Sequence, residues 1–282
     1  MSECYQQLFT SLRNNRKAGA TELALITLAE LKACLEEMPL QSISELGDMA
    51  DQLGHARPSM VVLSNALSRW QHRQELAKTF SKQGYMDGLS DIYREISDAS
   101  DNVAENASSL VKPGMTLLTH SRSSQISSLF EHLLEQHVNF NVVVTISEPS
   151  KEGLLVASEL DRFGIPVTVI TDAEMGLIMP IIDLNISGCD SWLSDHHFVN
   201  KTGTLLQALA AHHYGKPFWV LADSFKTNPQ TSHDITLETM PTDELRLPKG
   251  EHISGKNTYF ETIPTRLITG RVNEHGLEAM QS

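Results

Sequence analysis

The stretch THSRSSQ, residues 119–125, holds a dense group of side chains that can do chemistry. It directly follows the apolar run MTLL (115–118), so we expect a turn between a strand and a helix. Amide groups at a helix start, together with hydroxyls and an arginine, suit an anion such as phosphate. Ser121 could alternatively be a nucleophile, or a polar turn residue that caps the helix.

Four further apolar runs are followed by polar residues: VVVTI (142–146), VTVI (167–170), DLNIS (183–187) and FWVLA (218–222). Helix-like stretches lie between the runs. This alternation predicts a parallel sheet with helices on both faces, and ligands of such sheets bind outside the carboxyl ends of the strands. The segments after the five runs are therefore expected to meet at one rim. They offer His120, Ser121, Arg122, Ser123, Ser124, Asp172, Asp190, Asn200, Lys201, Thr202, Thr204 and Lys226.

This set of side chains suits a phosphorylated polyol, with amides and lysines for the phosphate and carboxylates for the hydroxyls. Asp190 follows a buried run immediately, so partial desolvation is expected to raise its pKa toward acid–base use. A turn-capping role is an equally simple reading of Asp190.

Residues 1–108 show a helical period instead. Ala24, Leu28, Leu31 and Leu35 fall on one helical face, and Thr21 is the expected N-cap of that helix. We therefore predict an α/β protein with an N-terminal helical domain, residues 1–108, followed by a parallel-sheet domain, residues 109–282.

Composition and missing motifs argue against several classes of function. The formal net charge of −13 over 282 residues disfavours direct binding to nucleic acid, and no apolar run is long enough for a membrane span. Three cysteines (Cys4, Cys34 and Cys189) form no CxxC pair, which predicts free thiols in a reducing cytoplasm. GxGxxG, GxxxxGK[ST] and GxSxG are all absent, so no nucleotide-cofactor, P-loop or hydrolase-elbow motif is present. Neither a cofactor nor a metal is predicted.

Several segments together resemble a known family: PGMTLLTHSRSS, GIPVTVITDAEMGLIM, SGCDSW with FVNKTGT, KPFWVLADSFK and YFETIPTRLITGRVNEHG. In the helical half, NNRKAGATELALITL and ARPSMVVLSNAL fit as well. The family comprises the alpha, beta and delta regulatory subunits of eukaryotic translation initiation factor 2B, ribose-1,5-bisphosphate isomerase and methylthioribose-1-phosphate isomerase. The resemblance spans residues 13–276 and is nearest to the alpha-type members.

The resemblance implies that the second domain is Rossmann-like and builds the oligomer. It also implies a sugar-phosphate site in the isomerases, where a cysteine and an aspartate carry the chemistry. The aspartate corresponds to Asp190, the family's Asn-Lys pair to Asn200 and Lys201, and a further lysine to Lys226. Arg57 lies in the matching Arg-Pro segment.

The cysteine position is occupied by Ser121, as in the non-isomerase alpha subunit. An alcohol ionises far less readily than a thiol, so Ser121 cannot simply replace it. Cys189 is either a relocated thiol or a small packing residue. At TISEPSKEG, enzyme members carry an arginine before the proline, whereas this chain places Glu148 there, so an anion would meet a carboxylate. Arg122 from the neighbouring loop could compensate.

Three functions follow as hypotheses. The first is a protein that binds a phosphorylated sugar or nucleotide without thiol-dependent isomerase chemistry. The second is an aldose–ketose sugar-phosphate isomerase that uses Asp190. The third is an alpha-like regulatory subunit of a guanine-nucleotide exchange complex. A homodimer or higher homo-oligomer is expected, because FETIPTRLITG (260–270) places apolar residues on a predicted exposed edge.

Overall fold

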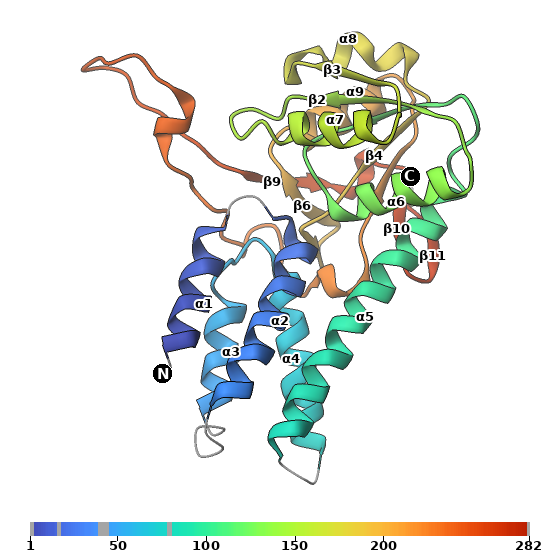
Figure 1. Ribbon diagram of the computed structural model, residues 1–282. Helices are drawn as coiled ribbons and strands as arrows, with labels where there is room; N and C mark the ends of the chain where they lie inside the picture. The colour runs from blue at the N-terminus through green and yellow to red at the C-terminus, as the bar shows by residue number, and fades with distance from the viewer. Residues whose placement is uncertain (1–2, 16–17, 39–44, 78–80, 281–282) are drawn as a thin grey trace.

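The computed structural model describes residues 3–15, 18–38, 45–77 and 81–280. Its N-terminal part is a group of helices that pack side by side (Figure 1). Their buried apolar faces, including Leu28, Leu31 and Trp70, form one core. The helices are α1 (Glu3–Asn14), α2 (Ala20–Glu37), α3 (Leu46–Gly54), α4 (Val61–Leu76) and α5 (Lys82–Ser108).

Helix α2 begins two residues earlier than its sequence suggests, at Ala20. Gly19 occupies the N-cap position in extended geometry, and no side chain caps the helix there. Thr21, predicted to be the cap, lies inside the first turn. The prediction was wrong because Gly is also accepted at an N-cap and leaves the helix amides open.

A seven-stranded sheet forms the centre of the second part, in the order β11-β10-β7-β4-β1-β2-β3. The five predicted apolar runs are confirmed as its adjacent parallel strands. The sequence did not indicate β10 and the antiparallel β11, which extend one edge. The strands are β1 (Thr116–Thr119), β2 (Asn141–Thr145), β3 (Val167–Ile170), β4 (Leu184–Ser187), β7 (Phe218–Leu221), β10 (Gly270–Asn273) and β11 (Gly276–Ala279).

Helices cover both faces of this sheet, as predicted. Alternate strand residues point to opposite faces: Leu117 joins a core with α5, α6 and α7, whereas Leu118 joins a core with α8 and α9. These helices are α6 (Ser124–Glu135), α7 (Glu152–Arg162), α8 (Met175–Ile178) and α9 (Thr204–His213).

A second, four-stranded sheet in the order β8-β5-β6-β9 was not predicted. Its strands are β5 (Ser191–Leu193), β6 (His197–Lys201), β8 (Thr227–Asn228) and β9 (Phe260–Pro264), too short to show a clear period. Leu193, Val199 and Phe260 from this sheet join the core of the helical part. The small sheet therefore fastens the helical part to the rim of the large sheet. Between β8 and β9 the chain makes a long excursion that projects from the body (orange in Figure 1).

Two sequence-based expectations need correction. Cys4 and Cys34 form a disulfide between α1 and α2, with 5.8 Å between their Cα atoms, so only Cys189 is a free thiol. The sequence could not show this, because 30 residues separate the two cysteines and only helix packing brings them together. The apolar residues of 260–270 are not on an exposed edge: Phe260, Ile263 and Leu267 are buried within the chain.

Among the described residues, no helix is both long enough and apolar enough to cross a bilayer.

Candidate functional site

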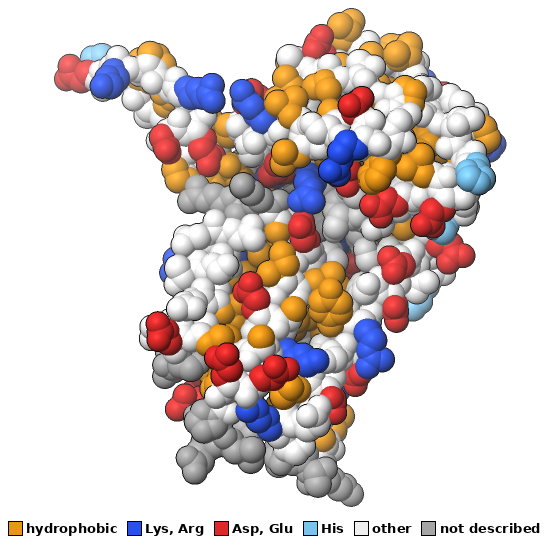
Figure 2. All heavy atoms as spheres, in the orientation of Figure 1, with side chains coloured by type: hydrophobic (Ala, Val, Ile, Leu, Met, Phe, Trp, Pro, Cys, Tyr) orange, Lys and Arg blue, Asp and Glu red, His pale blue; other side chains and the backbone are white. Residues whose placement is uncertain are grey.

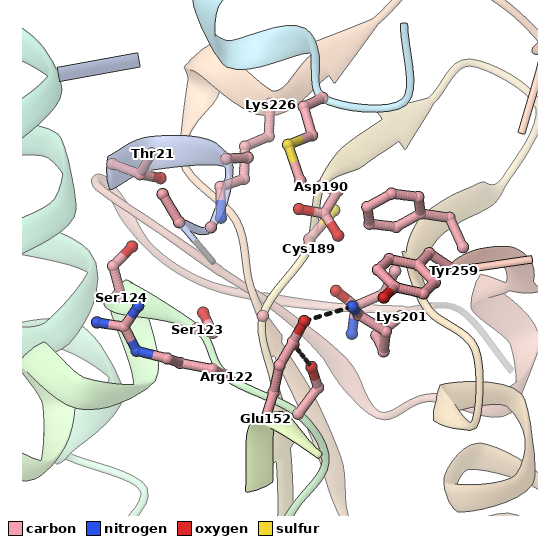
Figure 3. A pocket seen from close by; sticks show the side chains of 18 of the residues that line it. Thr21, Arg122, Ser123, Ser124, Glu152, Cys189, Asp190, Lys201, Lys226 and Tyr259 are labelled. Atoms are coloured by element: carbon pink, nitrogen blue, oxygen red, sulfur yellow. Dashed lines mark hydrogen bonds and ion pairs between the residues drawn. The ribbon is translucent and has the colours of Figure 1, made fainter. Parts of the chain in front are cut away.

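A polar hollow lies where the helical part meets the carboxyl ends of the β-strands (Figure 3). All ten residues singled out by sequence as site candidates line it. They are Arg57, His120, Ser121, Arg122, Ser123, Ser124, Asp190, Asn200, Lys201 and Lys226. The lining also includes residues that sequence reasoning missed: Ala18, Gly19, Ala20, Thr21, Met60, Glu152, Gly188, Tyr259 and Phe260.

Three residues of the predicted rim do not line the hollow. The Asp172 carboxylate accepts hydrogen bonds from the backbone N–H groups of Ser147 and Glu148 and so holds the β2 loop. Thr202 donates to the Thr258 carbonyl, and the Thr204 hydroxyl donates to the Lys201 carbonyl. Their roles are structural, because their polar atoms are used within the loops.

Two helices start at the hollow with open ends. The N-cap residues are Gly19 for α2 and Ser123 for α6, and neither provides a side-chain cap. The Thr21 hydroxyl is buried in the first turn of α2 and has no hydrogen-bond partner among the described residues. Uncapped helix N-termini carry unsatisfied N–H groups and a partial positive charge. This end of the hollow is therefore suited to an anion.

Ser121 is part of a charged group at the other end. Its hydroxyl donates to Glu152, whose other carboxylate oxygen accepts from the Lys201 ammonium at 2.7 Å. Burial raises the pKa of Glu152, but the Lys201 charge and the hydrogen bonds from Lys201 and Ser121 outweigh burial and lower it below its ordinary value. Glu152 is thus ionised and a weak base, so it cannot activate Ser121 as a nucleophile.

The Ser121 backbone is also occupied. Ser121 adopts the left-handed region with φ 64°, and its N–H donates to the Ser147 hydroxyl at 2.8 Å. This amide is not open to a ligand, although the loop had been expected to cradle phosphate through it. The open amides belong to the helices on either side of the hollow.

Asp190 lies between the two ends of the hollow as drawn in Figure 3. Its carboxylate accepts no hydrogen bond from the described residues, although its backbone N–H is bonded to Val199. Burial raises the pKa of Asp190 to about 6, against the lowering effect of Lys226 and Lys201. The raised pKa agrees with the sequence-based expectation. A carboxyl with this pKa can exchange a proton near neutral pH.

Cys189 is fully enclosed next to Asp190. Burial raises the pKa of its thiol to about 12, so the thiolate is not formed at neutral pH. Of the two readings of Cys189, the structure supports the small packing residue.

The four cations of the hollow differ in their partners. Arg57 pairs with Glu238 at 3.1 Å, and Arg122 pairs with Glu22 at 3.0 Å. Lys201 is held by Glu152, as described above. Lys226 is buried and donates to the Gln125 side-chain oxygen at 2.7 Å, a neutral partner, and has no ion pair among the described residues.

His120 and Asn200 are largely committed to the scaffold. His120 Nε2 donates to the Thr202 carbonyl at 2.8 Å, and Nδ1 lies 2.6 Å from the Thr145 hydroxyl. Burial lowers the pKa of His120, so the ring is neutral. The imidazole lies so close to Gly203 that a Cβ atom there would come within 2.5 Å of Nε2. Asn200 donates to the hydroxyls of Ser187 and Thr204.

Glu148 does not meet the hollow. It is exposed, and its carboxylate lies 3.6 Å from Lys151. The expected encounter of an anion with Glu148 was wrong, because Glu152, four residues later at the start of α7, is the carboxylate that faces the site. The signal for Glu152 was its place at the start of the helix after β2. For the N-terminus of α2, the only sequence signal was a glycine, Gly19, directly before the helical pattern.

Fold and site together define the class of protein: a Rossmann-like α/β protein whose helical part covers the rim formed by the carboxyl ends of the strands. The model of the Initiation factor 2 subunit family matches residues 9–279, so the chain belongs to that family.

Named relatives fall into two groups. A translation initiation factor eIF-2B subunit 2-like protein of Pyrococcus abyssi is 29% identical over 96% of this chain and 95% of its own length. A ribose 1,5-bisphosphate isomerase of Haloferax volcanii is 28% identical over 83% of this chain and 74% of its own. The solved structure of the Pyrococcus horikoshii translation initiation factor eIF-2B has a TM-score of 0.88 at 28% identity, covering 99% of this chain and 98% of that one.

Proposed function

We propose that the protein binds a phosphorylated sugar or nucleotide in the hollow, without thiol-dependent isomerase chemistry. The observation that carries this proposal is the pair of uncapped helix starts, α2 and α6, with the buried and unpartnered Thr21 hydroxyl between the helical part and the sheet. A phosphate accepts hydrogen bonds from such amides and hydroxyls at low cost, because they have no other partner to lose.

Helix α9 gives an internal comparison. Its first amides are also at the rim, but Glu261 accepts hydrogen bonds from the N–H groups of Gly203 and Leu205 at 2.7 and 2.9 Å. A carboxylate of the chain itself therefore satisfies α9. Among the described residues, the starts of α2 and α6 lack such a group, so a ligand anion is the natural partner for them. Lys226 adds a positive charge that forms no ion pair among the described residues.

The absence of a usable thiol supports a binding role. The Ser121 hydroxyl donates a hydrogen bond to Glu152, which is ionised and weakly basic. The pKa of the Cys189 thiol is too high for a thiolate to form at neutral pH. Neither side chain supplies the reactive sulfur that the family's isomerases use.

The test is a ligand screen by thermal shift. Ribose 5-phosphate, ribose 1,5-bisphosphate and AMP are compared with unphosphorylated ribose and with inorganic phosphate. We expect the phosphorylated ligands to raise Tm by several degrees, and Lys226→Met to lose most of that shift. Lys216→Met is the matched control, because Lys216 does not line the hollow and its ammonium donates to the Pro180 carbonyl. Equal Tm with and without every phosphorylated ligand would contradict the proposal.

A second candidate is an active sugar-phosphate isomerase that uses Asp190. The pKa of about 6 and the free carboxylate of Asp190 favour it. Proton NMR of the wild-type protein with ribose 1,5-bisphosphate decides between the two: a new ketose signal that Asp190→Asn abolishes supports the isomerase, and an unchanged spectrum excludes it for that substrate.

A further inference from the structure

The cations of the hollow are divided between the two ends, and this division bears on how many phosphates a ligand can carry. In Figure 3, Thr21, Ser123, Ser124 and Arg122 lie on one side, whereas Glu152, Lys201 and Tyr259 lie on the other. The first group contains residues from the starts of α2 and α6, which no side chain caps. The second already contains an anion, the Glu152 carboxylate.

The Lys201–Glu152 pair is well shielded from water. The side chains of Lys201 and Glu152 are 12% and 13% exposed, and the Lys201 ammonium also lies 4.3 Å from the centre of the Tyr259 ring. Breaking a buried ion pair leaves a charge without compensation, which is strongly unfavourable. A ligand phosphate at this end would have to displace Glu152 or lie beside its negative charge.

The Arg122–Glu22 pair is different. Its side chains are 31% and 38% exposed, and exposed pairs of this kind contribute little to stability. Loss of the Glu22 pair would therefore cost Arg122 little. Arg122, Lys226 and the starts of α2 and α6 line the same end of the hollow.

We propose that Glu152 is a specificity-determining residue that restricts the hollow to ligands with a single phosphate, held at the α2–α6 end, and a neutral hydroxyl-bearing end at Ser121, Glu152 and Lys201. The proposal rests on the proposed function and names its ligand class as a monophosphate. A carboxylate accepts hydrogen bonds from sugar hydroxyls, and Lys201 donates to their oxygens, so the second end recognises a polyol well.

Isothermal titration calorimetry with ribose 5-phosphate and ribose 1,5-bisphosphate tests this. We expect the wild-type protein to bind the monophosphate at least tenfold more tightly than the bisphosphate. Glu152→Gln keeps the shape of the side chain but frees the Lys201 charge, so it is expected to improve bisphosphate binding tenfold or more with a much smaller change for the monophosphate. Glu148→Gln removes a nearby exposed carboxylate outside the hollow and should leave both affinities unchanged.

The outcomes separate the two claims. A wild-type protein that binds the bisphosphate as tightly as the monophosphate overturns the role of Glu152 while leaving the proposed function intact. Binding of neither ligand, in the wild type or in either variant, overturns the proposed function itself. The ratio of the two affinities in the wild-type protein is decisive even if Glu152→Gln does not fold. A folded Glu152→Gln protein with the same ratio as the wild type also counts against the inference.

Discussion

At the scale of single residues, the chemistry of the hollow depends on how each side chain is paired. Ser121 and Lys201 are both bound to Glu152, whereas the Asp190 carboxylate and the Thr21 hydroxyl have no hydrogen-bond partner among the described residues. Residue type alone leaves Ser121 as a candidate nucleophile. Its pairing argues against that role, because Lys201 holds Glu152 ionised and so makes it a weak base toward the Ser121 hydroxyl. Asp190 remains the side chain able to exchange a proton near neutral pH.

Asp190→Asn is expected to stabilise the unliganded protein at alkaline pH. Because burial raises the pKa of Asp190 from its ordinary value of 3.8 to about 6, its favourable contribution to stability is present below pH 3.8 and is lost as the pH rises through 6. At pH 8 the variant should gain about 1 to 3 kcal/mol, since each unit of pKa shift corresponds to about 1.4 kcal/mol. Tm measured for both proteins from pH 4 to pH 8 checks this. The gap between them should widen with pH, and a constant gap would show that Asp190 does not titrate as argued. Asp161→Asn, at an exposed position, serves as the control.

At the scale of elements, the start of α2 is the feature on which the ligand argument depends. Helix α2 contributes its buried face to the helical core and its first turn to the hollow, so one element serves both packing and the site. Loops would place the same atoms less accurately, because an α-helix fixes the direction of its terminal amides. Two helices that begin at the same hollow reinforce each other as an anion site.

Thr21→Val tests this element. Valine has nearly the same shape as threonine, and the lost hydroxyl has no partner, so the unliganded protein should keep its stability or gain about 1 kcal/mol. The Tm shift caused by a phosphorylated ligand should fall markedly. Thr27→Val is the matched control in the same helix: its hydroxyl donates to the Leu23 carbonyl at 2.7 Å, so that change should cost about 1 kcal/mol and leave the ligand shift unaltered. The reverse pattern would show that Thr21 has only a structural role.

At the scale of the whole molecule, the hollow exists because two parts of the chain are fastened together. Asn65 of α4 donates to the backbone carbonyls of Phe225 and Thr227, and Arg69 stacks on the Phe225 ring at 3.9 Å. These contacts bring the helical part over the rim of the sheet.

A second whole-molecule feature is an exposed apolar surface: Leu177, Ile181 and Leu206 are 78%, 64% and 55% exposed around α8 and α9. Figure 2 shows hydrophobic side chains gathered at this end of the molecule.

The homodimer stays a prediction, and the exposed apolar surface around α8 and α9 now supports it better than residues 260–270 did. We expect a second copy of the chain to cover this surface, because monomers rarely leave several large apolar side chains exposed together. Sedimentation velocity should give about twice the 31.3 kDa of one chain. Leu177→Asp should shift the protein toward the monomer, whereas Leu76→Asp, at an equally exposed position on α4, should not. A monomeric wild-type protein would contradict the expectation.

The sequence by itself determined the parallel sheet and the gathering of its loop residues. Strands such as VVVTI and VTVI are continuous apolar runs between helices, and parallel topology brings their carboxyl ends to one rim whatever the remaining details. The candidate residues that follow the strands therefore line one hollow, and Arg57 reaches it from the helical part. The family resemblance indicated which of them to single out.

Only the tertiary structure decided the state of those residues. Whether Ser121 is bonded to Glu152, whether Arg122 meets Glu22, and whether Cys4 reaches Cys34 depend on contacts between residues 30 to 100 positions apart in the chain. Charge, hydrogen bonding and desolvation act through distances in space. Local periodicity does not contain those distances, and so the sequence could predict where the site lies but not which of its groups are free to bind a ligand.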